Sequence, residues 1–277
     1  MILKSFLFTI FLIAFTVPIN AQKIEWTSDY AAAEKIARQT GKPLLLDFTT
    51  VWCGLCRLMD AKFWTRSDVI EISKQFVSVK LDGEKEELLA KRFGVSQFPA
   101  VVVADPWSAG IDSHTGFGQN ADRVIAGKAA SFPKDFNELK KSGDALEKNQ
   151  NDSSALHDFA AFYSQRKLYN LSIELYKKVL KVENTPAKRE AALYNLAADS
   201  LKIGRYGEAL TYFETLQKEF PQSLQAEMVE YGIFNSHLGK NNLAEAEKHL
   251  AKFKANFPHS KIITQAEQAL QNRKSRN

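Results

Sequence analysis

Cysteine is nearly absent from this chain of 277 residues, which contains only two. A small secreted fold held together by disulfides needs several pairs, and a structural zinc site takes four ligands, which two cysteines alone cannot supply. Histidine is also scarce, and the five histidines show no spacing typical of metal ligands. We therefore predict neither a metal site nor an organic cofactor, and the two cysteines need another explanation.

The chain also lacks a strong excess of either charge. It has 37 basic and 32 acidic residues, interspersed along its length, for a formal net charge of +5. Nucleic-acid-binding proteins usually gather basic residues into a patch or stripe, so we predict no nucleic-acid partner. With 45% hydrophobic and 25% charged residues the composition is that of a globular protein, and the length predicts two domains.

A hydrophobic run long enough to span a bilayer is missing from the N-terminus. The apolar run Phe6–Val17 has about twelve residues, whereas a membrane-spanning helix takes about twenty. Lys4 precedes the run and residues 18–21 follow it, which is the layout of a secretory signal peptide. We predict cleavage after Ala21 and an exported protein, periplasmic or secreted, without stable membrane insertion. A bacterial lipoprotein would need a cysteine near Ala21, and none lies there. The alternative is that the apolar run is retained as a membrane anchor.

A change of pattern divides the rest of the chain into two predicted domains. Residues 22–140 mix short β-branched runs with helical stretches, whereas residues 153–273 are helical throughout. The polar segment 141–152, which contains Gly143, is predicted to be a linker or a partly helical connection. Strands alternating with helices in the first domain predict an α/β sandwich. The expected strands are 44–49, 76–81, 100–104 and a hairpin strand near 111, and the expected helices are 28–41, 67–75, 84–93 and two that begin near 54 and 121.

The two cysteines lie three positions apart, after the predicted strand 44–49 and at the first turn of the next helix. Unpaired backbone N–H groups and the helix dipole stabilise an anion there, so we expect the pKa of the Cys53 thiol to fall. A thiolate attacks a substrate disulfide, and Cys56 can then attack the mixed disulfide; in reverse, the pair passes its disulfide to a dithiol. The alternative is a static structural disulfide.

The segment Leu45–Arg57 resembles the active-site segment of thioredoxins, and further features match that family in order. These are a Val-Lys-Leu-Asp sequence around Lys80, Phe93-Gly94-Val95, and Phe98-Pro99 before an apolar strand. Residues 62–69 are more similar to exported thioredoxin-like reductase domains. The resemblance implies a thioredoxin-like α/β fold for the first domain.

The resemblance also implies roles in catalysis. Cys53 would be the nucleophile and Cys56 the resolving thiol, while a buried Asp47 would help to move the Cys56 proton. Lys80 would pair with Asp47 and tune it. The alternatives are an exposed Asp47 at the strand end and a Lys80 that is plain surface.

Substrate contacts would come from Trp52, Phe98 and Pro99. The resemblance implies a cis Pro99 packed against the disulfide, with the backbone of Phe98 free to pair with an extended substrate segment. Two features depart from the family, because Gly54-Leu55 replaces the common Gly-Pro and Phe98 replaces a smaller residue. Reduction potential and partner choice are therefore not carried over.

The second domain repeats with a period of 37 residues. Residues 169–176 align with 206–213, and Phe220-Pro221 recurs as Phe257-Pro258. The unit resembles a tetratricopeptide repeat, which implies an all-α region of about three helix pairs closed by a capping helix over 260–271. The third copy matches only if two residues are inserted near Asn241-Asn242. Helix pairs that cover one another's apolar faces form a curved stack whose concave side can dock a peptide or protein.

Together these features predict an exported thiol–disulfide oxidoreductase that acts on protein dithiols and disulfides. Because the chain has no third cysteine, electrons must come from or go to a redox partner protein. The repeat region would dock a partner. The alternative from another class is a redox-inactive scaffold in which the repeats bind partners and the first domain is only a binding module. A peroxidase or a holdase chaperone using the same pair is a third interpretation.

Overall fold

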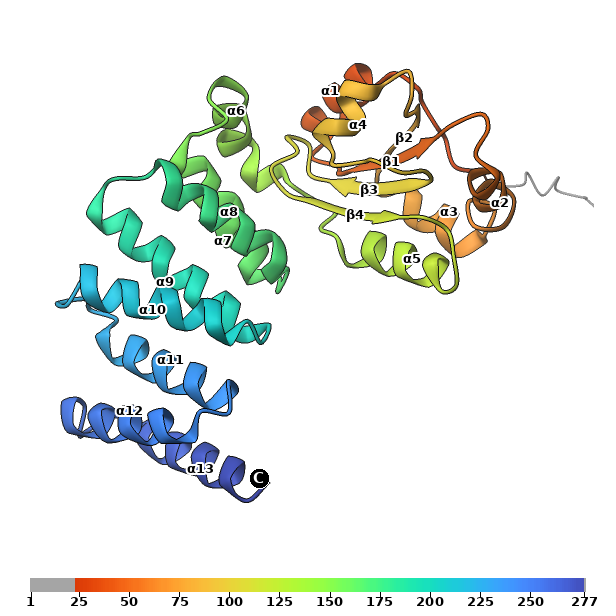
Figure 1. Ribbon diagram of the computed structural model, residues 1–277. Helices are drawn as coiled ribbons and strands as arrows, with labels where there is room; N and C mark the ends of the chain where they lie inside the picture. Colours follow the sequence, from red (N-terminus) through yellow and green to blue (C-terminus); the bar gives the residue numbers. More distant parts are fainter. Residues whose placement is uncertain (1–22, 277) are drawn as a thin grey trace, which may run out of the picture.

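The computed structural model describes residues 23–276, so the predicted signal peptide, residues 1–21, lies outside the described part. Figure 1 shows a sheet flanked by helices in the N-terminal part and a stack of helices in the C-terminal part. Within residues 23–276, no helix has both the length and the apolar character that crossing a membrane requires.

The sheet has four strands in the order β2-β1-β3-β4. Its two central strands, β1 (Leu44–Thr49) and β3 (Ala100–Ala104), run antiparallel and are almost entirely buried. Strand β2 (Val77–Asp82) lies parallel to β1, and β4 (Ile111–Thr115) pairs antiparallel with β3. The apolar runs 44–49 and 100–104 are therefore strands that are buried on both faces, which explains why they do not alternate with polar residues.

Helices cover both faces of this sheet, and alternate residues of β1 contact each layer. Leu44, Leu46 and Phe48 pack with α1 and α4, whereas Leu45 packs with α2, α3 and α5. Because side chains alternate along a strand, Asp47 faces the same layer as Leu45, the layer that contains α2. The helices are α1 (Tyr30–Thr40), α2 (Gly54–Lys62), α3 (Ser67–Ser73), α4 (Glu87–Arg92) and α5 (Ala121–Ser131).

Helix α4 begins at Glu87, three residues later than the predicted start at Glu84. The intervening residues form a turn around Asp82, whose side chain accepts a hydrogen bond from the Glu84 N–H and whose carbonyl accepts one from the Glu86 N–H. Aspartate competes in this way with the helical hydrogen-bond pattern, so the acidic stretch 84–86 becomes a turn.

Between the two parts, the segment predicted as a linker or partly helical connection contains helix α6 (Lys140–Lys148), preceded by the short 3₁₀ turn η1 (Asn137–Leu139). Within residues 153–276 the chain forms three consecutive helix pairs and a closing helix, which Figure 1 shows stacked one after another. These are α7 (Ser153–Gln165), α8 (Tyr169–Val182), α9 (Pro186–Lys202), α10 (Tyr206–Glu219), α11 (Ala226–Gly239), α12 (Leu243–Asn256) and α13 (Ile263–Lys274).

The repeat keeps its period of 37 residues through all three pairs, so the predicted insertion near Asn241-Asn242 is wrong. Lys167, Gly204 and Asn241, each 37 residues from the next, have φ values of 61°, 78° and 60° in the turns within the pairs. The insertion was predicted because the only glycine near the third turn, Gly239, lies 35 residues after Gly204 instead of 37. The turn position itself is held by Asn241, since asparagine also tolerates the left-handed conformation. Gly239 serves packing instead, since a Cβ there would lie 2.4 Å from the Tyr206 ring.

The sheet and the first helix pair share one buried cluster, which extends from Leu45 of β1 to Leu196 of α9. At the junction the Trp107 ring packs against Phe159 of α7 and covers Gly143 of α6, where a Cβ would lie 2.0 Å from the indole. Helices α6 and α7 are therefore packed onto the sheet-containing part through side chains that fit closely.

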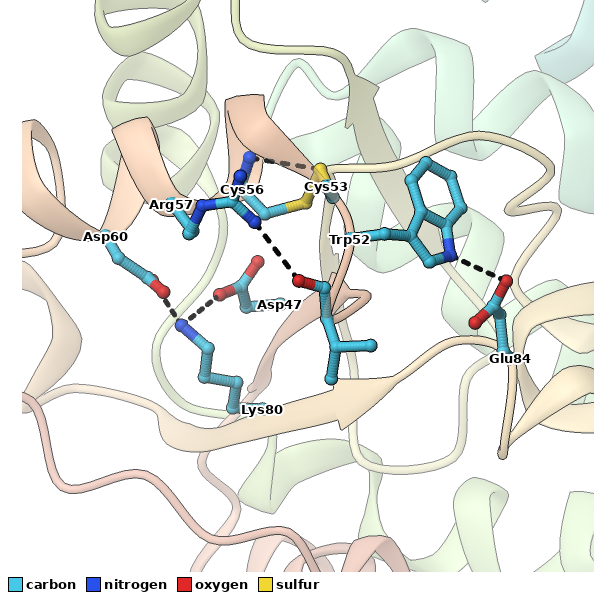
Figure 2. The surroundings of a disulfide bond; sticks show 9 residues. Asp47, Trp52, Cys53, Cys56, Arg57, Asp60, Lys80 and Glu84 are labelled. Atoms are coloured by element: carbon cyan, nitrogen blue, oxygen red, sulfur yellow. Dashed lines mark hydrogen bonds and ion pairs between the residues drawn. A yellow bond between two sulfur atoms is a disulfide. The ribbon is translucent and has the colours of Figure 1, made fainter.

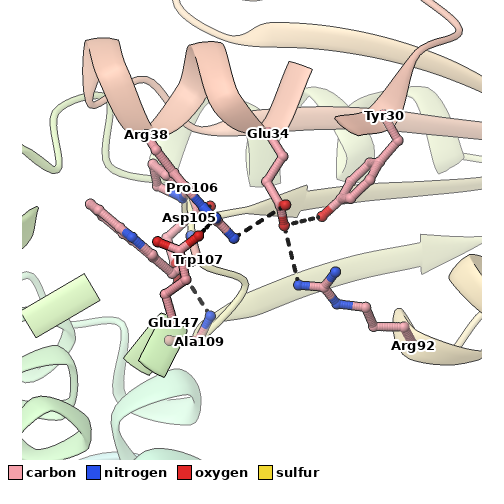
Figure 3. A network of polar contacts seen from close by, with 9 residues as sticks. All are labelled: Tyr30, Glu34, Arg38, Arg92, Asp105, Pro106, Trp107, Ala109 and Glu147. Carbon is pink, nitrogen blue, oxygen red and sulfur yellow. Dashed lines mark hydrogen bonds and ion pairs between the residues drawn. The ribbon is translucent and has the colours of Figure 1, made fainter. Parts of the chain in front are cut away.

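Polar contacts reinforce this junction, as Figure 3 shows for the loop between β3 and β4. The buried Asp105 carboxylate accepts hydrogen bonds from the backbone N–H groups of Trp107, Ala109 and Gly110, and from the Tyr163 hydroxyl of α7 at 2.9 Å. Arg38 of α1 donates to the Pro106 carbonyl and pairs with Glu147 of α6. One aspartate thus shapes the loop and ties it to the first repeat helix.

Candidate redox site

The two cysteines form a disulfide at the start of α2, with their Cα atoms 5.2 Å apart. A tight turn precedes it, in which the Cys53 N–H donates to the Thr50 carbonyl. The Cys53 sulfur caps the helix by accepting a hydrogen bond from the Cys56 N–H at 3.0 Å, as Figure 2 shows. Negative charge that develops on this sulfur after reduction would lie at the positive end of the helix.

Apolar side chains stand exposed around the buried disulfide. Val51 is 81% exposed and Trp52 is 63% exposed, and Leu55 and Leu58 of α2 are also exposed. The Trp52 indole N–H donates to Glu84 at 2.9 Å, which holds the ring in place without covering it. Exposed apolar groups of this kind suit contact with an apolar segment of another molecule.

Behind the disulfide, Asp47 and Lys80 lie opposite each other on β1 and β2. The Lys80 ammonium is 3.1 Å from Asp47 Oδ2, and it also pairs with Asp60 of α2, as Figure 2 shows. Asp47 is completely buried, so it is not an exposed strand-end residue, and Lys80 is not plain surface. No described residue donates a well-directed hydrogen bond to the Asp47 oxygens, which leaves the ammonium as their main compensation.

Burial raises the pKa of Asp47 to about 6, against the opposing effect of Lys80. Burial favours the neutral form of Lys80, but the Asp47 and Asp60 carboxylates outweigh it and raise the pKa of Lys80. A carboxyl group that titrates near neutral pH can both accept and return a proton, as general acid–base chemistry requires.

Replacing Asp47 with Asn is expected to stabilise the oxidised protein at pH 7 by about 1 to 3 kcal/mol. Because the folded-state pKa of about 6 lies above the ordinary 3.8, the folded protein binds more protons between these values and loses stability as pH rises through that window. Urea denaturation should therefore show the gain at pH 7 and little difference near pH 4.

The matched control is Asp60→Asn, which removes the half-exposed carboxylate that shares Lys80. It is expected to change the free energy of unfolding by about 1 kcal/mol or less, because exposed ion pairs contribute little. An Asp47→Asn protein less stable than wild type at pH 7 would contradict the assignment.

The Phe98–Pro99 peptide bond is cis, as predicted, and it lies directly before β3. The Phe98 ring packs over Gly83 so closely that a Cβ on residue 83 would lie 2.1 Å from it. Gly83 thus makes room for the large residue that departs from the family pattern. Contact between Pro99 and the disulfide, and pairing of the Phe98 backbone with substrate, stay predictions.

Two residues of this site were missed by sequence reasoning. Asp60 lies four positions after Cys56, one turn along the same helix face. Helical periodicity could therefore have predicted that Asp60 lies near Asp47 and Lys80. Glu84 offered no such signal, because its contact with Trp52 depends on the turn that replaces the expected start of α4.

Both parts of the chain match known protein families. Residues 25–106 match a family described as thioredoxin-like, and residues 186–267 match a family described as outer membrane lipoprotein. The protein disulfide-isomerase erp38 of Neurospora crassa is 33% identical over 73 residues, which cover 26% of this chain and 20% of that protein. The thiol:disulfide interchange protein DsbD of Ralstonia nicotianae is 30% identical over 88 residues, 30% of this chain and 14% of that protein.

Among solved structures, a DsbH oxidoreductase aligns at a TM-score of 0.36 and 24% identity, over 44% of this chain and 94% of that one. The matched segments span a fifth or less of the length of the erp38 and DsbD proteins named above. The N-terminal part is a thioredoxin-like domain of the disulfide oxidoreductase type with its Cys53–Cys56 pair, and a tetratricopeptide-like helical region follows it.

Proposed function

We propose that this protein is an exported thiol–disulfide oxidoreductase that exchanges a disulfide with protein substrates through Cys53 and Cys56. The observation that carries the proposal is the disulfide at the N-terminus of α2, whose Cys53 sulfur accepts a hydrogen bond from the Cys56 N–H in the first turn of the helix. Residues 22–140 would form the redox domain and residues 153–273 the repeat domain.

Reduction of a substrate proceeds in two exchanges. The Cys53 thiolate attacks one sulfur of the substrate disulfide, which forms a mixed disulfide and releases the other substrate sulfur as a thiolate. Cys56 then loses its proton and attacks the Cys53 sulfur, so that the second substrate thiol leaves and the Cys53–Cys56 bond forms. Two electrons pass from the pair to the substrate, and the reverse sequence oxidises a substrate dithiol.

Asp47 would accept the Cys56 proton, since it is buried beneath α2 and its pKa of about 6 lets it take up a proton near neutral pH. Lys80, bound to Asp47 and Asp60, would limit how far burial raises that pKa. The exposed Trp52, together with Phe98 and Pro99, would contact an extended substrate segment.

Export is supported by the apolar segment 6–17, which has the layout of a signal peptide. The similar proteins fit an envelope setting, because one is named a thiol:disulfide interchange protein and the helical region matches a family described as outer membrane lipoprotein. An oxidising compartment is also where protein disulfides, the substrates of this chemistry, form and persist.

The repeat region would hold a protein partner near the redox pair. Leu224, in the loop between α10 and α11, and Met228, in the first turn of α11, are exposed, and Leu224 borders a groove of about 540 Å³ that also contacts α9. Replacing both residues with Ser in the full chain should leave insulin reduction unchanged and weaken capture of a natural partner. Unaltered capture would remove this part of the proposal.

The function is tested with the protein comprising residues 22–277 and its variant with both cysteines replaced by Ser. In the presence of dithiothreitol, the wild-type protein should accelerate the precipitation of insulin that follows reduction of its disulfides, and the double variant should not. Equal rates for the two proteins would contradict an oxidoreductase and favour the scaffold. Alkylation across a glutathione series then gives the reduction potential, which decides between reductase and oxidant.

A further inference from the structure

Three side chains that commonly ligate metals meet at the turn between α11 and α12. His237 lies in the last turn of α11, Glu245 in the first turn of α12, and His249 four residues further on the same helix face. One ligand atom from each lies within 4.8 Å of the other two. The fold thus brings together three residues that are separated by eight and four positions in the sequence and lie on two different helices.

His237 is 8% exposed, and its Nδ1 atom has no hydrogen-bond partner among the described residues. Its ring lies parallel to that of His249, with the ring centres 5.1 Å apart. A buried polar atom without a partner is costly and rare, and it calls for a binding partner outside the chain.

His249 is already oriented for ligation by the buried Glu230. The Glu230 carboxylate lies 2.9 Å from His249 Nδ1 and is itself held by the Lys252 ammonium and the Gln217 amide, each at 2.8 Å. A proton on Nδ1 that bonds to this carboxylate leaves Nε2 free to bind a metal. A carboxylate behind a histidine in this way fixes the ring and increases its basicity in metal sites.

Glu245 can supply the third ligand. Among the described residues, its carboxylate forms one ion pair, with the Lys248 ammonium at 3.2 Å. The Lys248 side chain is largely exposed. An exposed pair of this kind contributes little free energy, so the carboxylate can exchange the lysine for a cation. Glu245 would then offset one of the two positive charges of a divalent ion, since the charge of Glu230 is already paired with Lys252.

We propose that His237, Glu245 and His249 bind a divalent transition metal of the zinc class, with a fourth position open to water or to a group of a docked partner. Two imidazoles and one carboxylate form a zinc-type donor set, whereas magnesium and calcium prefer oxygen ligands throughout. Ligand atoms around a tetrahedral zinc with bonds of 2.0–2.1 Å lie about 3.3 Å apart, so binding draws the three side chains inward. The ion joins α11 to α12 and thereby fixes the last helix pair.

The test is titration of Zn²⁺ into the full chain with the Cys53–Cys56 disulfide intact, so that free thiols cannot bind the ion. Calorimetry should show one site, and Mg²⁺ or Ca²⁺ should show none. His249→Ala should abolish binding and Glu245→Gln, a change at the helix surface that spares the fold, should weaken it at least about tenfold. The control His259→Ala, in the loop after α12, should bind as wild type does.

Thermal unfolding gives a second measurement. Saturating Zn²⁺ should raise the Tm of the wild-type protein and of His259→Ala, raise that of Glu245→Gln less, and leave that of His249→Ala unchanged, because only a ligand bound to the folded state stabilises it. Zinc binding of equal strength in all four proteins, or no binding by the wild type, would overturn the proposal.

Discussion

Replacing Cys53 with Ser is expected to lower insulin-disulfide reduction to the rate of the dithiothreitol control. A serine hydroxyl at the start of α2 stays protonated at neutral pH and cannot attack a disulfide, whereas a thiol can ionise there. The measurement is the rate of insulin precipitation at fixed protein concentration. Leu55→Ser is the matched control, because it puts the same side chain between the cysteines and keeps both thiols; it should retain most of the activity.

Replacing Cys56 with Ser should instead stop the reaction after the first exchange. Cys53 still attacks, but no thiol remains to resolve the mixed disulfide, so a covalent complex with the substrate accumulates. Non-reducing electrophoresis and mass spectrometry would detect this complex and identify natural partners. If Cys53→Ser accumulated as much complex as Cys56→Ser, the assignment of nucleophile and resolving thiol would be wrong.

Replacing Asp105 with Ala is expected to lower the free energy of unfolding by about 3 to 5 kcal/mol. The carboxylate is fully buried and accepts hydrogen bonds from three backbone N–H groups and from the Tyr163 hydroxyl. Alanine leaves these four donors in the protein interior without an acceptor, and each unsatisfied donor is costly. Urea denaturation followed by tryptophan fluorescence measures the loss, because Trp107 lies in the affected loop.

Tyr163→Phe provides the control for this loss. It removes one of the four donors and leaves the loop bonded to Asp105, so we expect a decrease of about 1 to 2 kcal/mol. Since the two residues join the β3–β4 loop to α7, the effects should be less than additive in the double variant. An Asp105→Ala protein that loses no more stability than Tyr163→Phe would show that the backbone donors find other acceptors.

Local patterns were sufficient to predict most elements of the N-terminal part. The apolar runs 44–49 and 100–104 became buried strands, and Gly41 ends α1 in the left-handed conformation. The resemblance of Leu45–Arg57 to thioredoxins also anticipated a buried Asp47 paired with Lys80. These features depend on residues close together in the sequence or on a strongly marked motif.

Features that depend on packing between distant segments were harder to predict. Segment 141–152 looked like a linker because it is polar, yet Gly143 and Leu146, three positions apart, form a buried face of α6. The link between Asp105 and Tyr163 joins residues 58 positions apart and leaves no local pattern. The cluster around His237 was overlooked because its ligands come from two helices across a turn.

Under the proposed function, the continuous cluster from the sheet into α9 would bear on which substrate disulfides can reach Cys53. A flexible tether would let the repeat stack sample many orientations, and the local concentration of a docked partner at Cys53 would fall as the tether lengthened. Here the close packing of Trp107 over Gly143 and against Phe159 restricts the orientation of the repeat stack relative to the sheet. A partner bound to the helices would therefore lie at a fixed distance from the Cys53 sulfur. The protein would then select among disulfides by their position within the partner as well as by their local sequence.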